Sequence, residues 1–116
     1  MKAFPLALAG ALALAGPIDA PAQPSPARPI AFVVPFAPGG ATDTLARQFA
    51  ERMSGGGKHA IIIENTPGAG GTVGATRVAR AKPDGYTFLI GHVGYMAAAP
   101  GLYKQLAYDP VQDFDA

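Results

Sequence analysis

The chain has 116 residues, of which 49% are hydrophobic, and it carries 15 glycines, 12 prolines and a formal net charge of +1. This length holds one domain and excludes a second complete one. A net charge this small gives no indication of a nucleic-acid-binding surface. Cysteine is absent, which excludes disulfides, thiolate metal sites and thiol catalysis.

The N-terminal residues have the pattern of a secretory signal peptide. Lys2 gives a positive start, residues 3–16 are apolar, and Ala20-Pro21-Ala22 offers the small residues that a signal peptidase reads. The apolar stretch is shorter than the roughly 20 residues that span a bilayer, so we expect cleavage rather than a membrane anchor. Export then places the protein in the periplasm. The expected parts are a signal peptide (1–22), a proline-rich tether (23–29) and a folded segment (30–116).

Residues 29–36 form a short, nearly continuous apolar run, which predicts a strand buried on both faces of a parallel sheet. From Thr42 the period changes to that of a helix. The apolar residues Leu45, Phe49 and Met53 stand four apart, and polar side chains take the other side. This pattern predicts an amphipathic helix with Thr42 as its N-cap and the glycines at 55–57 as its end.

The rest of the chain repeats this alternation. Residues 60–63 predict a second buried strand, residues 72–81 a second helix after a glycine-rich turn, and residues 86–90 a third strand. The order βαβαβ with short connections predicts an α/β fold, a parallel sheet with helices on both faces. Residues 91–100 are a loop and a small-residue segment, and residues 101–116 predict a loop or an ill-defined turn of helix.

In an open parallel sheet, ligands bind beyond the carboxyl ends of the strands. Residues 37–43, 67–72 and 91–95 are expected to converge there. The first two segments join glycines to a helix N-terminus, whose N–H groups and dipole favour a carboxylate or phosphate. A tight strand-to-helix turn needs glycine in any case, which is the alternative explanation for either loop alone. Two such loops at one edge favour an anion site.

Two titratable residues at this edge have more than one interpretation. Asp43 would repel a bound carboxylate, so it either complements the helix dipole or contacts an ammonium, a hydroxyl or a water. His92 is either a donor to an anion or a surface or packing residue.

The sequence does not indicate an enzyme. It has no G-x-S-x-G motif, and Val73 stands where a dinucleotide fingerprint needs glycine, with no Gly-Lys-Ser/Thr following. We therefore predict no catalytic residues, no cofactor and no metal.

Four motifs in a fixed order resemble the Bug family, the periplasmic substrate-binding receptors of bacterial tripartite tricarboxylate transporters. They are residues 33–43 (VVPFAPGGATD), 64–71 (ENTPGAGG), 82–87 (KPDGYT), and the C-terminal series Leu102-Tyr103, 108–111 (YDPV) and Asp113-Phe114. The resemblance covers essentially all of residues 29–114. It implies a periplasmic binding protein type II-like first lobe, with the second lobe missing from this chain. It also implies a monomer that captures a small carboxylate and hands it to integral membrane transporter subunits.

The resemblance further implies ligand contacts from the loops after the first and third strands. The expected ligand-binding residues are Phe36, Ala37, Pro38, Gly39, Gly40 and Asp43 in the first loop, and Gly91, His92, Val93 and Tyr95 in the second. The second of these loops departs from the family pattern, so the sequence leaves the ligand open. Two other interpretations also stay open: an exported α/β hydrolase or nucleotide-using enzyme fragment, and a degenerate, inactive gene product.

Overall fold

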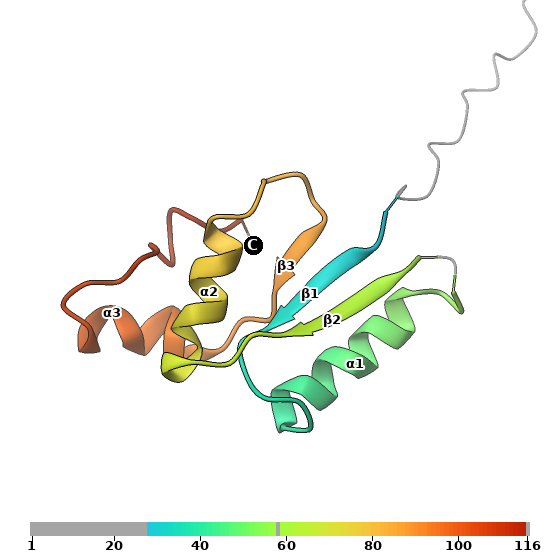
Figure 1. Ribbon diagram of the computed structural model, residues 1–116, viewed down its shortest axis with the longest axis horizontal. Coiled ribbons are helices and arrows are strands. Elements are labelled where there is room, and N and C mark those ends of the chain that lie inside the picture. Colours follow the sequence, from blue (N-terminus) through green and yellow to red (C-terminus); the bar gives the residue numbers. More distant parts are fainter. Residues whose placement is uncertain (1–27, 58, 116) are drawn as a thin grey trace, which may run out of the picture.

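The computed structural model describes residues 28–57 and 59–115, and it shows a small parallel sheet with helices on both faces (Figure 1). The elements in chain order are β1 (Ile30–Val34), α1 (Ala41–Met53), β2 (Ile61–Asn65), the 3-10 turn η1 (Ala69–Gly71), α2 (Thr72–Ala79), β3 (Thr87–Leu89), the π-helical turn η2 (Gly94–Ala98) and α3 (Ala99–Leu102). The predicted βαβαβ order is confirmed. The expected signal peptide and most of the tether lie outside the described residues, among which no helix is long and apolar enough to cross a membrane.

The sheet has the strand order β2-β1-β3, and both strand pairs are parallel. Val33 on β1 is in register with Glu64 on β2 and with Leu89 on β3. The carboxyl ends of the three strands therefore lie at the same edge of the sheet, and the loops that follow them leave from that edge, as predicted.

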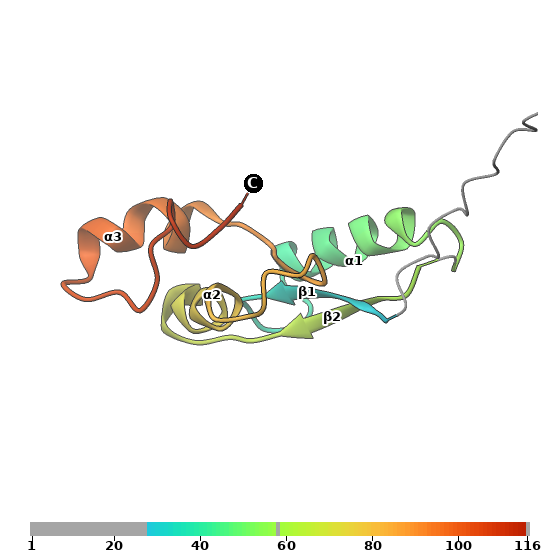
Figure 2. The ribbon, with the colours of Figure 1, turned by 90° about the horizontal axis from the view of Figure 1, so that it is seen from above.

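One helix covers each face of the sheet. Helix α1 packs on β1 and β2, and α2 packs on β1 and β3 from the opposite side (Figure 2). The central strand is therefore buried at Phe32, Val33 and Val34, as its apolar run predicted. The expectation that the second strand is buried is wrong at Ile62, which is 49% exposed. A single helix on each face leaves part of both edge strands uncovered.

Helix α1 contacts the sheet through its small residues. Ala46 and Ala50 are buried there, while Leu45, Phe49 and Met53 are 55%, 59% and 55% exposed. The extent of the amphipathic helix was predicted well, but its large apolar residues are not its buried side. The N-cap is also different, because the helix begins at Ala41 and Gly40 takes the capping position instead of Thr42.

A second group of buried side chains lies on the α2 side of the sheet. Its members are Ala75, Tyr95, Ala99 and Tyr108, with Phe36, Ala79, Leu89, Met96, Leu106 and Phe114 packed around them. The Tyr108 hydroxyl donates a hydrogen bond to the Tyr95 carbonyl oxygen. This contact fixes the irregular C-terminal segment against η2. The small-residue stretch before it is helical, which the sequence did not predict.

Candidate functional site

The loops after the three strands meet at the carboxyl edge of the sheet. The Phe36 ring lies edge-on to the His92 ring, with 5.2 Å between ring centroids, and its centroid is 6.2 Å from that of Tyr95. Gly71 approaches the same tyrosine so closely that a Cβ on it would overlap the ring. These contacts bring the β1–α1 loop (residues 35–40), the β2–α2 loop (residues 66–71) and the β3–η2 loop (residues 90–93) together.

The β1–α1 loop ends in two glycines with different conformations. Gly39 has a φ of +85°, which disfavours any residue with a Cβ. Gly40 is extended, with φ −76° and ψ 172°, and no side chain caps the N-terminus of α1. Residues 37–40 are all exposed. The first N–H groups of an α-helix have no partner within the helix, so this end of α1 presents donors toward the carboxyl edge.

Asp43 lies behind this loop with its carboxylate held by three donors. Its Oδ2 accepts from the Gly39 N–H at 2.8 Å and from Arg47 Nε at 2.9 Å, and its Oδ1 accepts from Asn65 Nδ2 at 2.9 Å. These hydrogen bonds, that from Arg47 foremost, hold the pKa of Asp43 well below its ordinary value. The side chain is buried and its oxygens point toward the protein.

Asn65 is the residue that the sequence analysis missed. It ends β2 beside the end of β1, and its Nδ2 also donates to the Phe36 carbonyl oxygen at 3.1 Å. In a sequence, a polar residue between a strand and a glycine-rich turn has the same pattern whether it only forms the turn or also hydrogen-bonds to a distant loop. The pairing of Asn65 with Val34 in the sheet decides between these two roles, and this register cannot be read from the sequence.

The β3–η2 loop places an exposed histidine at the same edge. Nδ1 of His92 accepts a hydrogen bond from the Gly94 N–H at 3.0 Å. In the neutral imidazole this contact assigns the proton to Nε2, which makes Nε2–H a donor. Gly91 and Val93 on either side are exposed as well. The loop can therefore present a hydrogen-bond donor and apolar surface to a ligand.

Tyr95 has a different environment from the other expected ligand residues. Its side chain is fully buried, and its hydroxyl donates to the Ile90 carbonyl oxygen. Burial raises the pKa of the phenol above its ordinary value. The hydroxyl is thus engaged within the chain, and the ring packs beneath Phe36 and His92 as the floor of the loops.

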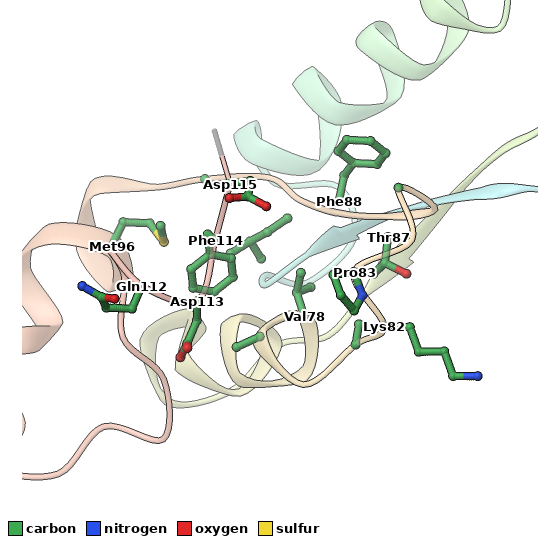
Figure 3. Close-up of a pocket in the computed structure, with 15 residues that line it drawn as sticks. Val78, Lys82, Pro83, Thr87, Phe88, Met96, Gln112, Asp113, Phe114 and Asp115 are labelled. Carbon is green, nitrogen blue, oxygen red and sulfur yellow. The ribbon is translucent and has the colours of Figure 1, made fainter.

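A hollow of about 630 Å³ runs along the outer edge of β3 as far as its carboxyl end at Leu89 (Figure 3). Val78 of α2 forms one side of it, and Phe114 and Asp115 of the C-terminal segment form another. Among the expected ligand residues, Gly91 lines it. The hollow therefore touches the β3–η2 loop, but no residue of the β1–α1 or β2–α2 loop lines it.

The arrangement at the carboxyl edge suits binding of an anion. It combines the amide groups at the start of α1 with the His92 imidazole, whereas the nearby carboxylate of Asp43 is turned inward and paired with Arg47. Within residues 28–57 and 59–115, no three His, Cys, Asp or Glu side chains gather in a way that could hold a metal ion.

Comparison with known proteins identifies the family. Residues 45–116 match the model of the tripartite tricarboxylate transporter family receptor. A UPF0065 protein of Agrobacterium vitis, encoded in the TAR-I ttuE-ttuC' intergenic region, is 46% identical over 101 residues, which cover 86% of this chain and 29% of that protein.

Two solved structures have the same fold. The periplasmic binding protein BugD is 50% identical, with a TM-score of 0.72, and the match covers 77% of this chain and 29% of BugD. MatC from Rhodopseudomonas palustris, solved with bound malate, is 52% identical, also with a TM-score of 0.72, and the match covers 77% of this chain and 30% of MatC. The chain thus spans less than a third of the length of these relatives, and it belongs to the Bug-type receptors of the tripartite tricarboxylate transporter family.

Proposed function

We propose that the complete protein carrying this sequence is a periplasmic solute-binding receptor for a small carboxylate, that it catalyses no reaction, and that it delivers its ligand to integral membrane transporter subunits. The observation that supports this most directly is the contact of Phe36 in the β1–α1 loop with His92, at the same edge of the sheet as the uncapped N-terminus of α1. Both elements offer hydrogen-bond donors at a place where parallel sheets bind ligands.

In this proposal a ligand carboxylate lies over the β1–α1 loop. It accepts hydrogen bonds from the N–H groups of Gly40 and the first turn of α1, where the positive end of the helix dipole also favours it. Nε2–H of His92 donates from the opposite loop. Ala37, Pro38 and Val93 supply apolar contact around these donors, and Phe36 and Tyr95 support them from below.

A small dicarboxylate is the ligand class that we propose first, because MatC is described with bound malate. A dicarboxylate has two charged ends, and these loops account for one of them. A binding cleft encloses its ligand between two walls and excludes water as it closes. The described loops form one wall. We therefore propose that the second carboxylate of the ligand binds to the part of the complete protein that corresponds to the remaining length of the relatives.

Calorimetric titration of the complete protein tests this proposal. Malate and the aliphatic dicarboxylates of neighbouring length are the ligands, and the diamide of malate is the control, since it has the same shape without the charges. We expect a dicarboxylate to bind and the diamide not to bind. Equal binding of both compounds, or binding of no acid in the series, would overturn the carboxylate assignment.

The proposed location has its own test, because it depends on the signal peptide. Cleavage after Ala22 leaves a mature protein that begins at Gln23. The intact mass of the protein recovered from the periplasmic fraction of the source cell should correspond to that start. A protein that keeps its first 22 residues, or one found in the cytoplasmic fraction, contradicts the proposed export.

A further inference from the structure

Asp43 is a buried carboxylate that the proposed ligand contacts do not use. It is 2% exposed although it stands in the first turn of α1, next to the proposed anion site. Both of its oxygens accept hydrogen bonds from the chain: Oδ2 from Gly39 and Arg47, and Oδ1 from Asn65. A carboxylate engaged in this way has its charge directed into the protein and away from the carboxyl edge.

The same group of residues holds both ends of the β1–α1 loop. At the far end of the loop, the Gly39 N–H donates to Asp43. At the near end, the Phe36 carbonyl oxygen accepts from Asn65 Nδ2, which also donates to Asp43. The two side chains thus connect the start and the end of the loop across Ala37 and Pro38. We call Asp43, Arg47 and Asn65 the loop clasp.

Arg47 completes the clasp by compensating the charge of Asp43. Its Nε lies 2.9 Å from Oδ2, and its Nη2 lies 3.4 Å from the Asn65 side-chain oxygen. The guanidinium is about half exposed, and the hydrogen bond to Asp43 raises its pKa. For a ligand carboxylate above the loop, the negative charge of Asp43 is therefore compensated by the positive charge of Arg47. This removes the repulsion that a lone aspartate at this position would cause.

We propose that Asp43 is a positioning residue for the anion site: together with Asn65 and Arg47 it holds the β1–α1 loop in the shape that leaves Gly40 and the first amides of α1 open, and it does not touch the ligand. This inference rests on the proposed carboxylate-binding function. It also gives Asn65 a specific role, because Asn65 is the member of the clasp that reaches both Asp43 and the loop backbone.

The first test uses the wild-type complete protein and needs no ligand. Gly39 lies in an exposed loop, so its amide exchanges rapidly with solvent unless the clasp protects it. We expect exchange at least about tenfold slower than for an unbonded amide. We also expect its NMR resonance to stay unchanged as the pH falls from about 7 to 4, a range over which an ordinary aspartate becomes about half protonated. Unprotected exchange of this amide in the folded chain overturns the proposal.

The second test replaces Asp43 with a residue of the same shape. Asp43→Asn has one carbonyl oxygen and one NH₂ group, and the site presents donors to both positions. An NH₂ group must then face a donor, so we expect Gly39 protection to fall about tenfold or more, the size of one charge-assisted hydrogen bond. Glu51→Gln is the matched control, because it removes one negative charge from an exposed position of the same helix.

Ligand binding by the complete protein decides between positioning and direct contact. If the clasp positions the loop, Asp43→Asn weakens carboxylate binding by about tenfold or more. If Asp43 faces the ligand, the same variant removes a repulsive charge and binding becomes tighter, which overturns the proposal. Arg47→Met should weaken binding more than Arg52→Met, which makes the same charge change in the last turn of α1.

These results separate the two proposals. A wild-type protein that binds no carboxylate contradicts the proposed function, and the protection of the Gly39 amide still reports whether the clasp exists. Carboxylate binding that is equal in wild type and in folded Asp43→Asn protein contradicts the clasp and leaves the proposed function intact. If Asp43→Asn protein does not fold, the wild-type exchange measurement and the two arginine variants carry the test.

Discussion

Gly40 is the residue whose substitution tests the anion site most directly. A Cβ built on Gly40 meets only the Ala37 carbonyl oxygen, at 3.7 Å, which is an ordinary contact. Its extended backbone is one that valine adopts readily. Gly40→Val therefore adds two methyl groups in front of the first amides of α1 while the rest of the chain keeps its contacts. We expect the variant to fold and to lose carboxylate binding.

The expected effects of Gly40→Val on stability and on binding differ in size. Replacing glycine at a compatible position stabilises by about 0.4–1 kcal/mol through the unfolded state. Loss of glycine at an N-cap costs a similar amount, so the stability should change by less than about 1 kcal/mol. A hydrogen bond to a charged group contributes about 1.5–3 kcal/mol. Blocking one such bond weakens binding by about 10- to 100-fold, and blocking two removes measurable binding.

Calorimetry with malate and thermal unfolding measure the two effects on the same complete protein. Gly101→Val is the matched control, since an added Cβ at Gly101 meets nothing within 4 Å and Gly101 belongs to α3 and not to any of the three loops. Gly40→Val with full affinity would refute the assignment of the β1–α1 loop as the anion site. Gly40→Val that unfolds would refute the conclusion that the fold tolerates a side chain there.

Three further predictions concern the fold and its pH dependence. Ala46→Leu should lower the free energy of unfolding of the 116-residue chain in urea by about 1–3 kcal/mol, because it overfills the contact between α1 and the sheet. Phe49→Gln, at an exposed position of the same helix, should change that free energy by less than about 0.5 kcal/mol. Equal effects of the two substitutions would contradict the orientation of α1. Gly71→Ala should destabilise by about 1–3 kcal/mol in a thermal melt, since its φ is +99° and the new Cβ overlaps Tyr95; an unchanged melting temperature would contradict the close approach of these loops. The pKa of Asp43 is lowered from 3.8 in the folded chain, so its carboxylate stabilises the fold fully above that pH and loses this effect as the pH falls below it. Asp43→Asn should therefore make the free energy of unfolding less dependent on pH below about 4, while Asp84, whose pKa is lowered mainly by its hydrogen bond from Arg28, keeps its own contribution in both proteins.

The features that the sequence predicted correctly depend on local signals. The change from a continuous apolar run to helical spacing after Gly40 marks the end of β1 and the start of α1. Pro83 and the Asp84-Gly85 turn mark the end of the second helical segment before β3 in the same way. Short connections between parallel strands then leave little freedom in topology, and this is why three loops could be assigned to one edge of the sheet.

The features that the sequence did not predict depend on contacts between distant segments. In the sequence, Tyr95 is an expected ligand-binding residue of a loop, and its burial follows from packing against α2 and Tyr108. Asn65 reads as a turn residue, and its role follows from its register with Val34. The irregular segment after α3 also carries no periodicity that would place Tyr108 in the core.

Helix α1 shows why an apolar stripe does not by itself identify the buried side of a helix. Arg47 flanks the buried alanines on the side of β2, where it reaches Asn65. By helical spacing, Leu45 and Phe49 lie on the opposite flank from Arg47. Phe88 is 47% exposed, and its ring points to the side of the sheet on which α1 lies (Figure 3).

An exposed apolar flank of this kind is the surface on which a further helix packs in an α/β protein. The chain spans about 29% of the length of relatives such as BugD. In a protein of their length, we expect a neighbouring element to cover Leu45, Phe49 and Phe88. We thus expect two sets of contacts for α1: the buried alanines pack on the sheet, as the structure shows, and the large apolar residues pack on an element of the longer protein.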